Sequence, residues 1–254
     1  MRFKHLVPAV SLNFKNNDAN LPHLLSQCKQ ALTELITRDK NRPSVIAYSV
    51  CNEPIPQSWK PNLHTSPGAS AQERDIEVTF MTSLIQHARS LDNTRLVTFA
   101  SLEGGGLDSW FNLVDFICLN RYFGWYNLGG RLSQAKQVLA QDLEEVHSRH
   151  PNKPILLSEF GADTIAGAHA LESEMFSEEY QVEMIKMYLD VAERPWVAGT
   201  HVWNLTDFKT SQGVNRVAGY NLKGVFTVLR RPKMAAHYLR ARWNKEATTH
   251  VWKL

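Results

Sequence analysis

The sequence predicts an α/β protein built around a parallel β-sheet, and three observations lead to this fold class. The chain has 254 residues, of which 43% are hydrophobic and 21% charged, a composition typical of a globular protein with a sizeable core. Short runs rich in β-branched and aromatic residues alternate along the chain with longer amphipathic stretches. The short runs are almost continuously apolar, as is typical of parallel strands covered on both faces.

Five of the apolar runs are predicted to be strands: Ser44–Cys51, Arg95–Ser101, Asp115–Asn120, Pro154–Phe160 and Ala198–Asn204. A sixth strand is expected near Leu6–Ser11. Apolar residues recur every three or four positions in the stretches between, which predicts helices over Leu21–Thr37, Ser70–Leu91, Ser133–Ser148 and Ser177–Val191. A last helix is predicted to start near Pro232, because proline suits the first position of a helix.

Composition excludes several classes of function. The chain carries 28 basic and 25 acidic residues, a net charge of +3, and the basic residues are spread out, so no nucleic-acid partner is predicted. No apolar run approaches the roughly 18 residues of a membrane-spanning helix. The first apolar run is short and interrupted by Pro8, which does not indicate a signal peptide, so the localisation stays open.

The cysteine and histidine patterns predict neither a disulfide framework nor a metal site. Cys28, Cys51 and Cys118 make an odd count without zinc-ligand spacing, and we expect them to be buried thiols. Histidines and carboxylates also show no ligand spacing, so no metal or cofactor is predicted.

Polar and charged residues stand where the predicted strands end. Glu53 and Glu159 close two different strands, and in parallel sheets ligands bind at the carboxyl ends of strands. Paired carboxylates are what cleavage of a glycosidic bond requires, because one protonates the leaving oxygen while the other attacks the anomeric carbon or activates water. From spacing alone, two solvated acids at the starts of loops remain an alternative.

Several segments follow one another in an order shared with one enzyme family. They are residues 36–54 (ITRDKNRPSVIAYSVCNEP), 120–126 (NRYFGWY), 158–167 (SEFGADTIAG), 175–181, 201–208, 223–227 and 231–236. In these segments the chain resembles glycoside hydrolase family 2, and within it most closely the β-glucuronidases. The resemblance extends from about Ala9 to Trp243, which is nearly the whole chain.

The resemblance implies a retaining glycosidase and a role for each site residue. Glu53 would be the general acid/base and Glu159 the nucleophile. Asn52 would bind the 2-hydroxyl of the sugar, Tyr122 would hold the nucleophile, and Trp203 would form the floor under the apolar face of the sugar. From the residues alone, the aromatic side chains of Tyr122, Tyr126 and Trp203 could also belong to the core.

The substrate implied by the resemblance is a terminal β-linked uronic acid, a β-D-glucuronide. Asn221 and Lys223 match the motif that binds the C6 carboxylate of the sugar, and Arg216 and Tyr126 match positions near the same carboxylate. Ammonium and amide donors suit a carboxylate, although without the resemblance a solvated lysine and a turn-forming asparagine would be the simpler interpretation. The chain has one extra residue between Arg216 and Asn221, which we identify as Tyr220, so glucuronate versus galacturonate stays open.

For the fold, the resemblance implies a (β/α)8 TIM barrel that is incomplete, comprising about the last five βα units. We expect residues 1–254 to be the C-terminal portion of a family 2 catalytic barrel, without the N-terminal sandwich domains and the first βα units. A fragment or truncated gene model is the favoured explanation; one piece of a larger assembly and a short natural form stay open.

Two other functions stay open beside hydrolysis of glucuronides. The chain could be a non-catalytic, truncated homologue that binds sugar or a partner subunit, and activity of this chain alone is left open. It could also be a β-galacturonidase or a glycosidase for neutral sugars. A homo-oligomer is implied by the resemblance only.

Overall fold

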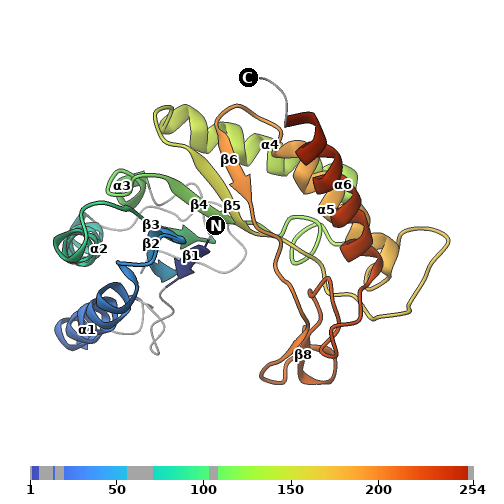
Figure 1. Cartoon of the computed structure of the whole chain (residues 1–254), viewed down its shortest axis with the longest axis horizontal. Helices are drawn as coiled ribbons and strands as arrows, with labels where there is room; N and C mark the ends of the chain where they lie inside the picture. Colours follow the sequence, from blue (N-terminus) through green and yellow to red (C-terminus); the bar gives the residue numbers. More distant parts are fainter. Residues whose placement is uncertain (1, 6–13, 15–19, 56–70, 103–107, 251–254) are drawn as a thin grey trace. The chain divides into compact units, whose positions relative to one another are not determined.

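Strands and helices alternate along the chain in the computed structural model, which describes residues 2–5, 14, 20–55, 71–102 and 108–250 (Figure 1). The strands are β1 (Arg2–His5), β2 (Val45–Asn52), β3 (Leu96–Ser101), β4 (Ile117–Asn120), β5 (Ile155–Glu159), β6 (Val197–Thr200), β7 (Phe208–Lys209) and β8 (Tyr220–Asn221). The helices are α1 (Leu21–Asp39), α2 (Ala71–Leu91), α3 (Asp108–Phe111), α4 (Leu132–Arg149), α5 (Glu178–Val191) and α6 (Met234–His250). The five strands and five helices predicted from sequence are therefore confirmed, with shifts at their ends.

The strands β1 to β6 form one sheet in which they lie in chain order. The pairs β1–β2, β2–β3 and β3–β4 are parallel. Strands in chain order with intervening helices are the arrangement of a (β/α) barrel, and the six described strands are fewer than the eight of a complete one. The incomplete barrel predicted from sequence is thus confirmed. The predicted edge strand near Leu6–Ser11 lies outside the described residues, and the first strand of the sheet, β1, comes just before it.

The chain divides into two compact units. The first unit comprises Met1–Asn120, Asp142–Leu156 and Trp196–Ala198, and it holds β1 to β4 with the beginnings of β5 and β6. The second comprises Arg121–Gln141, Leu157–Pro195 and Gly199–Leu254, and it holds the ends of β5 and β6, the helices α5 and α6, and the antiparallel pair β7–β8.

In the first unit, α1 packs against α2 (Figure 1). The buried face of α1 follows the helical spacing of its apolar residues and includes Leu24, Cys28, Leu32 and Ile36. The strand β2 is buried along almost its whole length, as expected for a strand covered on both faces. All three cysteines are unpaired and buried, as predicted. Burial raises the pKa of the Cys28 thiol to about 11, so this thiol stays protonated at neutral pH.

A buried acid, Asp92, follows α2 in the same unit. Its carboxylate accepts hydrogen bonds from Tyr48 Oη at 2.8 Å, the Thr94 backbone nitrogen at 2.9 Å and Arg95 Nη1 at 2.6 Å. Burial alone would raise the pKa of Asp92, but the Thr94 hydroxyl, which donates to Asp92 Oδ1 at 2.6 Å, and these other donors outweigh it and lower the pKa to about 2, from an ordinary value of 3.8. The ionised carboxylate therefore stabilises the folded unit at neutral pH.

Because the pKa of Asp92 is lower in the folded state, its stabilisation is complete above about pH 4 and is lost as the pH falls toward 2. We expect Asp92→Asn to lower the free energy of unfolding at pH 7 by about 2 kcal/mol and to flatten its decline between pH 4 and 2. Urea unfolding at a series of pH values measures both effects. The exposed acid Glu145 is the control, since Glu145→Gln should change stability by less than about 0.5 kcal/mol. An unchanged acid slope in Asp92→Asn would contradict the assignment.

In the second unit, α5 packs against α6 (Figure 1). The hydroxyl of Ser177 caps the start of α5 by accepting from the Tyr180 backbone nitrogen at 3.1 Å. Glu178 follows in the first turn, and its carboxylate accepts from the backbone nitrogens of Gly167 at 2.7 Å and Met234 at 2.6 Å. This buried acid therefore joins a loop and the start of α6 to α5. No helix within the described ranges is both long and apolar enough to cross a membrane.

Candidate active site

Glu53 lies directly after β2 in the first unit. The register of β2 against β3 shifts between Ser49 and Asn52, and the Glu53 backbone nitrogen donates to the Ala100 carbonyl at 2.9 Å. Glu53 has a φ of 49°, in the left-handed region that is uncommon for a glutamate. Such conformations persist where surrounding structure holds them, often at functional sites. The backbone thus fixes the direction in which this half-buried side chain leaves the strand.

Asn120 ends β4 and is fully buried. Its side-chain nitrogen donates to Asn52 Oδ1 at 3.1 Å and to Glu53 Oε1 at 2.7 Å. An amide nitrogen carries two hydrogens, so both bonds can form at once. Asn120 therefore orients two predicted site residues together. Asn120 is not among the site residues predicted from sequence, although it ends an apolar strand as Glu159 does.

Glu159 ends β5 in the second unit and is largely buried. Its Oε2 accepts a hydrogen bond from Tyr122 Oη at 2.8 Å. Its backbone carbonyl accepts from the Arg121 nitrogen at 2.8 Å, which fixes the strand end. The phenol thus helps to orient the Glu159 carboxylate, while the role that the sequence predicts for Tyr122 stays a prediction.

Two cations of the second unit share one carboxylate. Lys223, which is fully buried, forms an ion pair with Asp163 and donates to Tyr126 Oη at 3.0 Å. Arg216 Nη2 donates to the same phenol oxygen at 3.1 Å, and Arg216 Nη1 lies 3.7 Å from Asp163 Oδ2. We call Tyr126, Asp163, Arg216 and Lys223 the cation cluster. Its formal charge is +1, because Lys223 and Arg216 are opposed by Asp163 alone among these four residues.

The cation cluster adjoins the Glu159 carboxylate through Tyr122. The Tyr122 ring packs edge-on against the Tyr126 ring, with centroids 5.2 Å apart. Lys223 Nζ lies 5.8 Å from the centre of the Tyr122 ring and 4.7 Å from that of Tyr126. Because Tyr122 also binds Glu159, a carboxylate and a positively charged cluster lie next to each other within one unit.

Asn221 shapes the segment that carries Lys223. Asn221 is buried in β8, and its Oδ1 accepts from the Lys223 backbone nitrogen at 3.1 Å. The backbone nitrogen of Leu222, which lies between these two residues, donates to Asp163 Oδ1 at 2.7 Å. Asn221 therefore forms a turn that presents Lys223 to Asp163, whereas the buried Lys223 is not the solvated lysine of the simpler interpretation.

Trp203 is half-buried, and its ring meets the Phe208 ring edge-on at 6.1 Å. Its backbone nitrogen donates to the Phe160 carbonyl at 2.8 Å, and the peptide bond to Asn204 is cis. A Cβ at Gly161 would overlap the Trp203 carbonyl, so only glycine allows this close approach.

Seven of the nine predicted site residues lie in the second unit, while Asn52 and Glu53 lie in the first.

The segment between Arg216 and Asn221, where the resemblance implies one extra residue, forms a tight turn. Ala218 and Gly219 both have a positive φ, of 51° and 75°, within a short 3₁₀ helix. Arg216 still reaches Tyr126 and the neighbourhood of Asp163. The insertion therefore does not displace Arg216 from the cation cluster.

Within the ranges given above for the described residues, no three His, Cys, Asp or Glu side chains are grouped as a metal ion would require.

Comparison with known proteins decides the family. The model of glycosyl hydrolases family 2, TIM barrel domain, matches residues 4–247. The chain belongs to glycosyl hydrolase family 2. This confirms both the family resemblance and the barrel fold that the sequence predicts.

The chain is similar in sequence to several β-glucuronidases. The chain is 38% identical to the β-glucuronidase of Homo sapiens over 91% of its own length and 33% of the relative. It is also 38% identical to the β-glucuronidase of Paenibacillus borealis, with 94% and 38% of the two chains covered. The chain thus spans about a third of the length of these relatives.

Solved structures show the same likeness. The β-glucuronidase of Ruminococcus gnavus in complex with D-glucuronic acid has a TM-score of 0.76 at 38% identity, covering 88% of this chain and 36% of that one. The β-D-glucuronidase of Dictyoglomus thermophilum has a TM-score of 0.75 at 42% identity, covering 87% and 35%.

Asp163 is a second residue, after Asn120, that is not among the site residues predicted from sequence. Asp163 follows Glu159 by four positions, and this spacing alone does not single it out. Its pairing with Lys223 joins residues 60 positions apart and depends on the fold.

Proposed function

We propose that this protein hydrolyses terminal β-D-glucuronides by a retaining, double-displacement mechanism. The observation that carries the proposal is the cation cluster next to the Glu159 carboxylate in the second unit. The names of the relatives support it, as does the R. gnavus structure with bound D-glucuronic acid.

The cation cluster favours a substrate with a negative charge. A carboxylate on C6 of the sugar would balance the formal +1 charge and accept hydrogen bonds from Lys223 and Arg216. Tyr126 is 44% exposed, so the cluster opens to solvent at this residue. A neutral hexose would offer Arg216 and Lys223 no carboxylate beyond that of Asp163, so it would gain less from this cluster than a uronate does.

Glu159 is proposed as the nucleophile, held by Tyr122 at 2.8 Å. Its carboxylate oxygen bonds to the anomeric carbon while the bond from that carbon to the leaving oxygen breaks. Glu53 is proposed as the general acid that gives its proton to the leaving oxygen. The products of this step are a free alcohol and a glucuronyl ester on Glu159.

In the second step, water attacks the anomeric carbon and the ester bond to Glu159 breaks. Glu53, now a carboxylate, takes a proton from the water. Asn120 keeps the Glu53 carboxyl in place through the bond at 2.7 Å and orients Asn52, which is proposed to bind the sugar 2-hydroxyl. Trp203 is proposed as the floor under the sugar ring. The two inversions together leave the β configuration in the product.

To test the proposal, the 254-residue chain is assayed with 4-nitrophenyl β-D-glucuronide, the matching β-D-galacturonide and the β-D-glucoside. We expect the glucuronide to be cleaved at least about tenfold faster than the other two, and proton NMR to show β-D-glucuronic acid before the α anomer.

Each other outcome contradicts one part of the proposal. A preference for the galacturonide or the glucoside would overturn the substrate assignment. Initial appearance of the α anomer would overturn the retaining mechanism. No turnover of any substrate would overturn catalysis by this chain and favour a protein that only binds sugar or a partner.

A further inference from the structure

The second unit contains an ion pair to which no role has yet been given. Lys233 precedes α6 and Asp207 precedes β7, and the Lys233 ammonium lies 2.9 Å from Asp207 Oδ1. The side chain of Lys233 is fully buried and that of Asp207 is 5% exposed. Lys233 also donates to the carbonyls of Thr164 at 2.8 Å and Leu222 at 3.0 Å. These three bonds use all three hydrogens of the ammonium group.

Two of these hydrogen bonds are accepted by residues that are adjacent in sequence to members of the cation cluster. One carbonyl that accepts from Lys233 belongs to the residue before Lys223, and the other belongs to the residue after Asp163. Asp207 Oδ1 accepts at 3.0 Å from the backbone nitrogen of the residue after Lys223. The pair thus holds the chain on both sides of Lys223 and next to the carboxylate that Lys223 binds.

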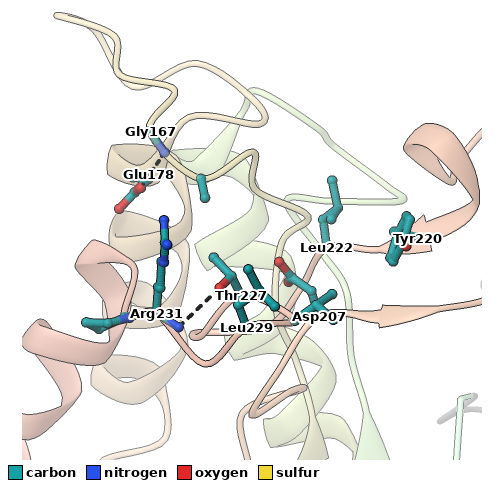
Figure 2. A pocket seen from close by; sticks show the side chains of 11 residues that line it. Gly167, Glu178, Asp207, Tyr220, Leu222, Thr227, Leu229 and Arg231 are labelled. Atoms are coloured by element: carbon teal, nitrogen blue, oxygen red, sulfur yellow. Dashed lines mark hydrogen bonds between the residues drawn. The ribbon is translucent and has the colours of Figure 1, made fainter.

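Close packing does not hold this segment on every side. Leu222, Asp207 and Tyr220 border an open pocket of about 570 Å³, as Figure 2 shows. On that side these residues face solvent and not close-packed protein atoms. The position of the chain before Lys223 therefore depends more strongly on its hydrogen bonds than in a filled core.

Burial opposes the charge on both members of the pair. It lowers the pKa of Lys233, although Asp207 acts in the other direction, and it raises the pKa of Asp207 against the effect of Lys233. A buried ion pair is weak evidence for stability, because desolvation offsets much of the attraction. Its defined geometry, by contrast, can determine where the attached segments lie.

We propose that the Asp207–Lys233 pair is a positioning device that places Lys223 for binding of the substrate carboxylate. Neither residue is proposed to touch the substrate. The inference rests on the function proposed above, in which Lys223 binds the uronate.

The test is the double variant Asp207→Asn/Lys233→Met, which removes both charges and leaves neither one buried alone. We expect KM for 4-nitrophenyl β-D-glucuronide to rise at least about tenfold while kcat stays within about twofold, because ground-state binding of the carboxylate is weakened. The single variant Asp207→Asn keeps an oxygen for the Gly224 amide, and we expect it to raise KM by about threefold. The single variant provides the measurement if the double variant does not fold.

The matched control is Asp92→Asn/Arg95→Met, which removes another buried ion pair, in the first unit. It should lower the melting temperature and leave KM unchanged. If the Asp207 variants lower kcat or the melting temperature but leave KM unchanged, the pair is merely structural and the inference is wrong. If the unmodified chain cleaves no glucuronide, the proposed function itself fails, and this result does not depend on the variants.

Discussion

Replacing Glu159 with alanine is expected to reduce kcat for β-glucuronide hydrolysis by at least about a thousandfold. Without this carboxylate no glucuronyl ester can form, and the remaining groups can only orient the substrate. Tyr122 donates to Glu159 at 2.8 Å, so the isosteric variant Glu159→Gln tests the charge while retaining an oxygen that accepts this bond. Steady-state assays with a chromogenic glucuronide measure both variants.

The control for this prediction is Glu183→Gln, which changes an exposed acid on α5. Its kcat should stay within about twofold of the unmodified protein. Ordinary activity in Glu159→Ala would show that another residue is the nucleophile.

The variant Lys223→Met is expected to lower kcat/KM for the glucuronide by about 100- to 1,000-fold, because a buried ion partner of the substrate carboxylate is removed. For the β-glucoside, which has no carboxylate, the loss should be below about tenfold. Lys223 is fully buried against Asp163, so the melting temperature should fall as well. The ratio of the two kcat/KM values separates recognition from stability.

Two further variants sharpen this comparison. Lys223→Met/Asp163→Asn also removes the charge of the buried carboxylate that has lost its lysine, and it should recover melting temperature without recovering glucuronide activity. Lys209→Met changes an exposed lysine in β7 and should have little effect on either substrate. Equal losses on glucuronide and glucoside in Lys223→Met would contradict binding of the carboxylate by this residue.

The parts of the fold that local patterns determine could be predicted from sequence. The continuous burial of β2 and the apolar spacing on α1 follow from side chains close together in the chain, and both appear in the structure. The ends of β2 and β5 likewise marked Glu53 and Glu159, because a charged residue directly after a buried strand is conspicuous.

The parts that depend on long-range contacts could not be predicted. Asn120 contacts Glu53 across 67 positions, and Asp163 reaches Lys223 across 60. Lys233 lies after β8 in the chain and contacts Asp207 only because the chain folds back between these two residues. An asparagine or an aspartate in a motif shows which groups are present, but only the fold shows which partner each one binds.

The most direct test of the proposed mechanism is to trap its covalent intermediate. The protein is incubated with 2-deoxy-2-fluoro-β-D-glucuronyl fluoride, in which fluoride leaves as the nucleophile bonds to the anomeric carbon and the second fluorine slows the following hydrolysis. Mass spectrometry of the digested protein should then find one 2-fluoroglucuronyl group, attached to Glu159. A label on Glu53 or another residue, or turnover of glucuronides without any labelled protein, would contradict Glu159 as the nucleophile.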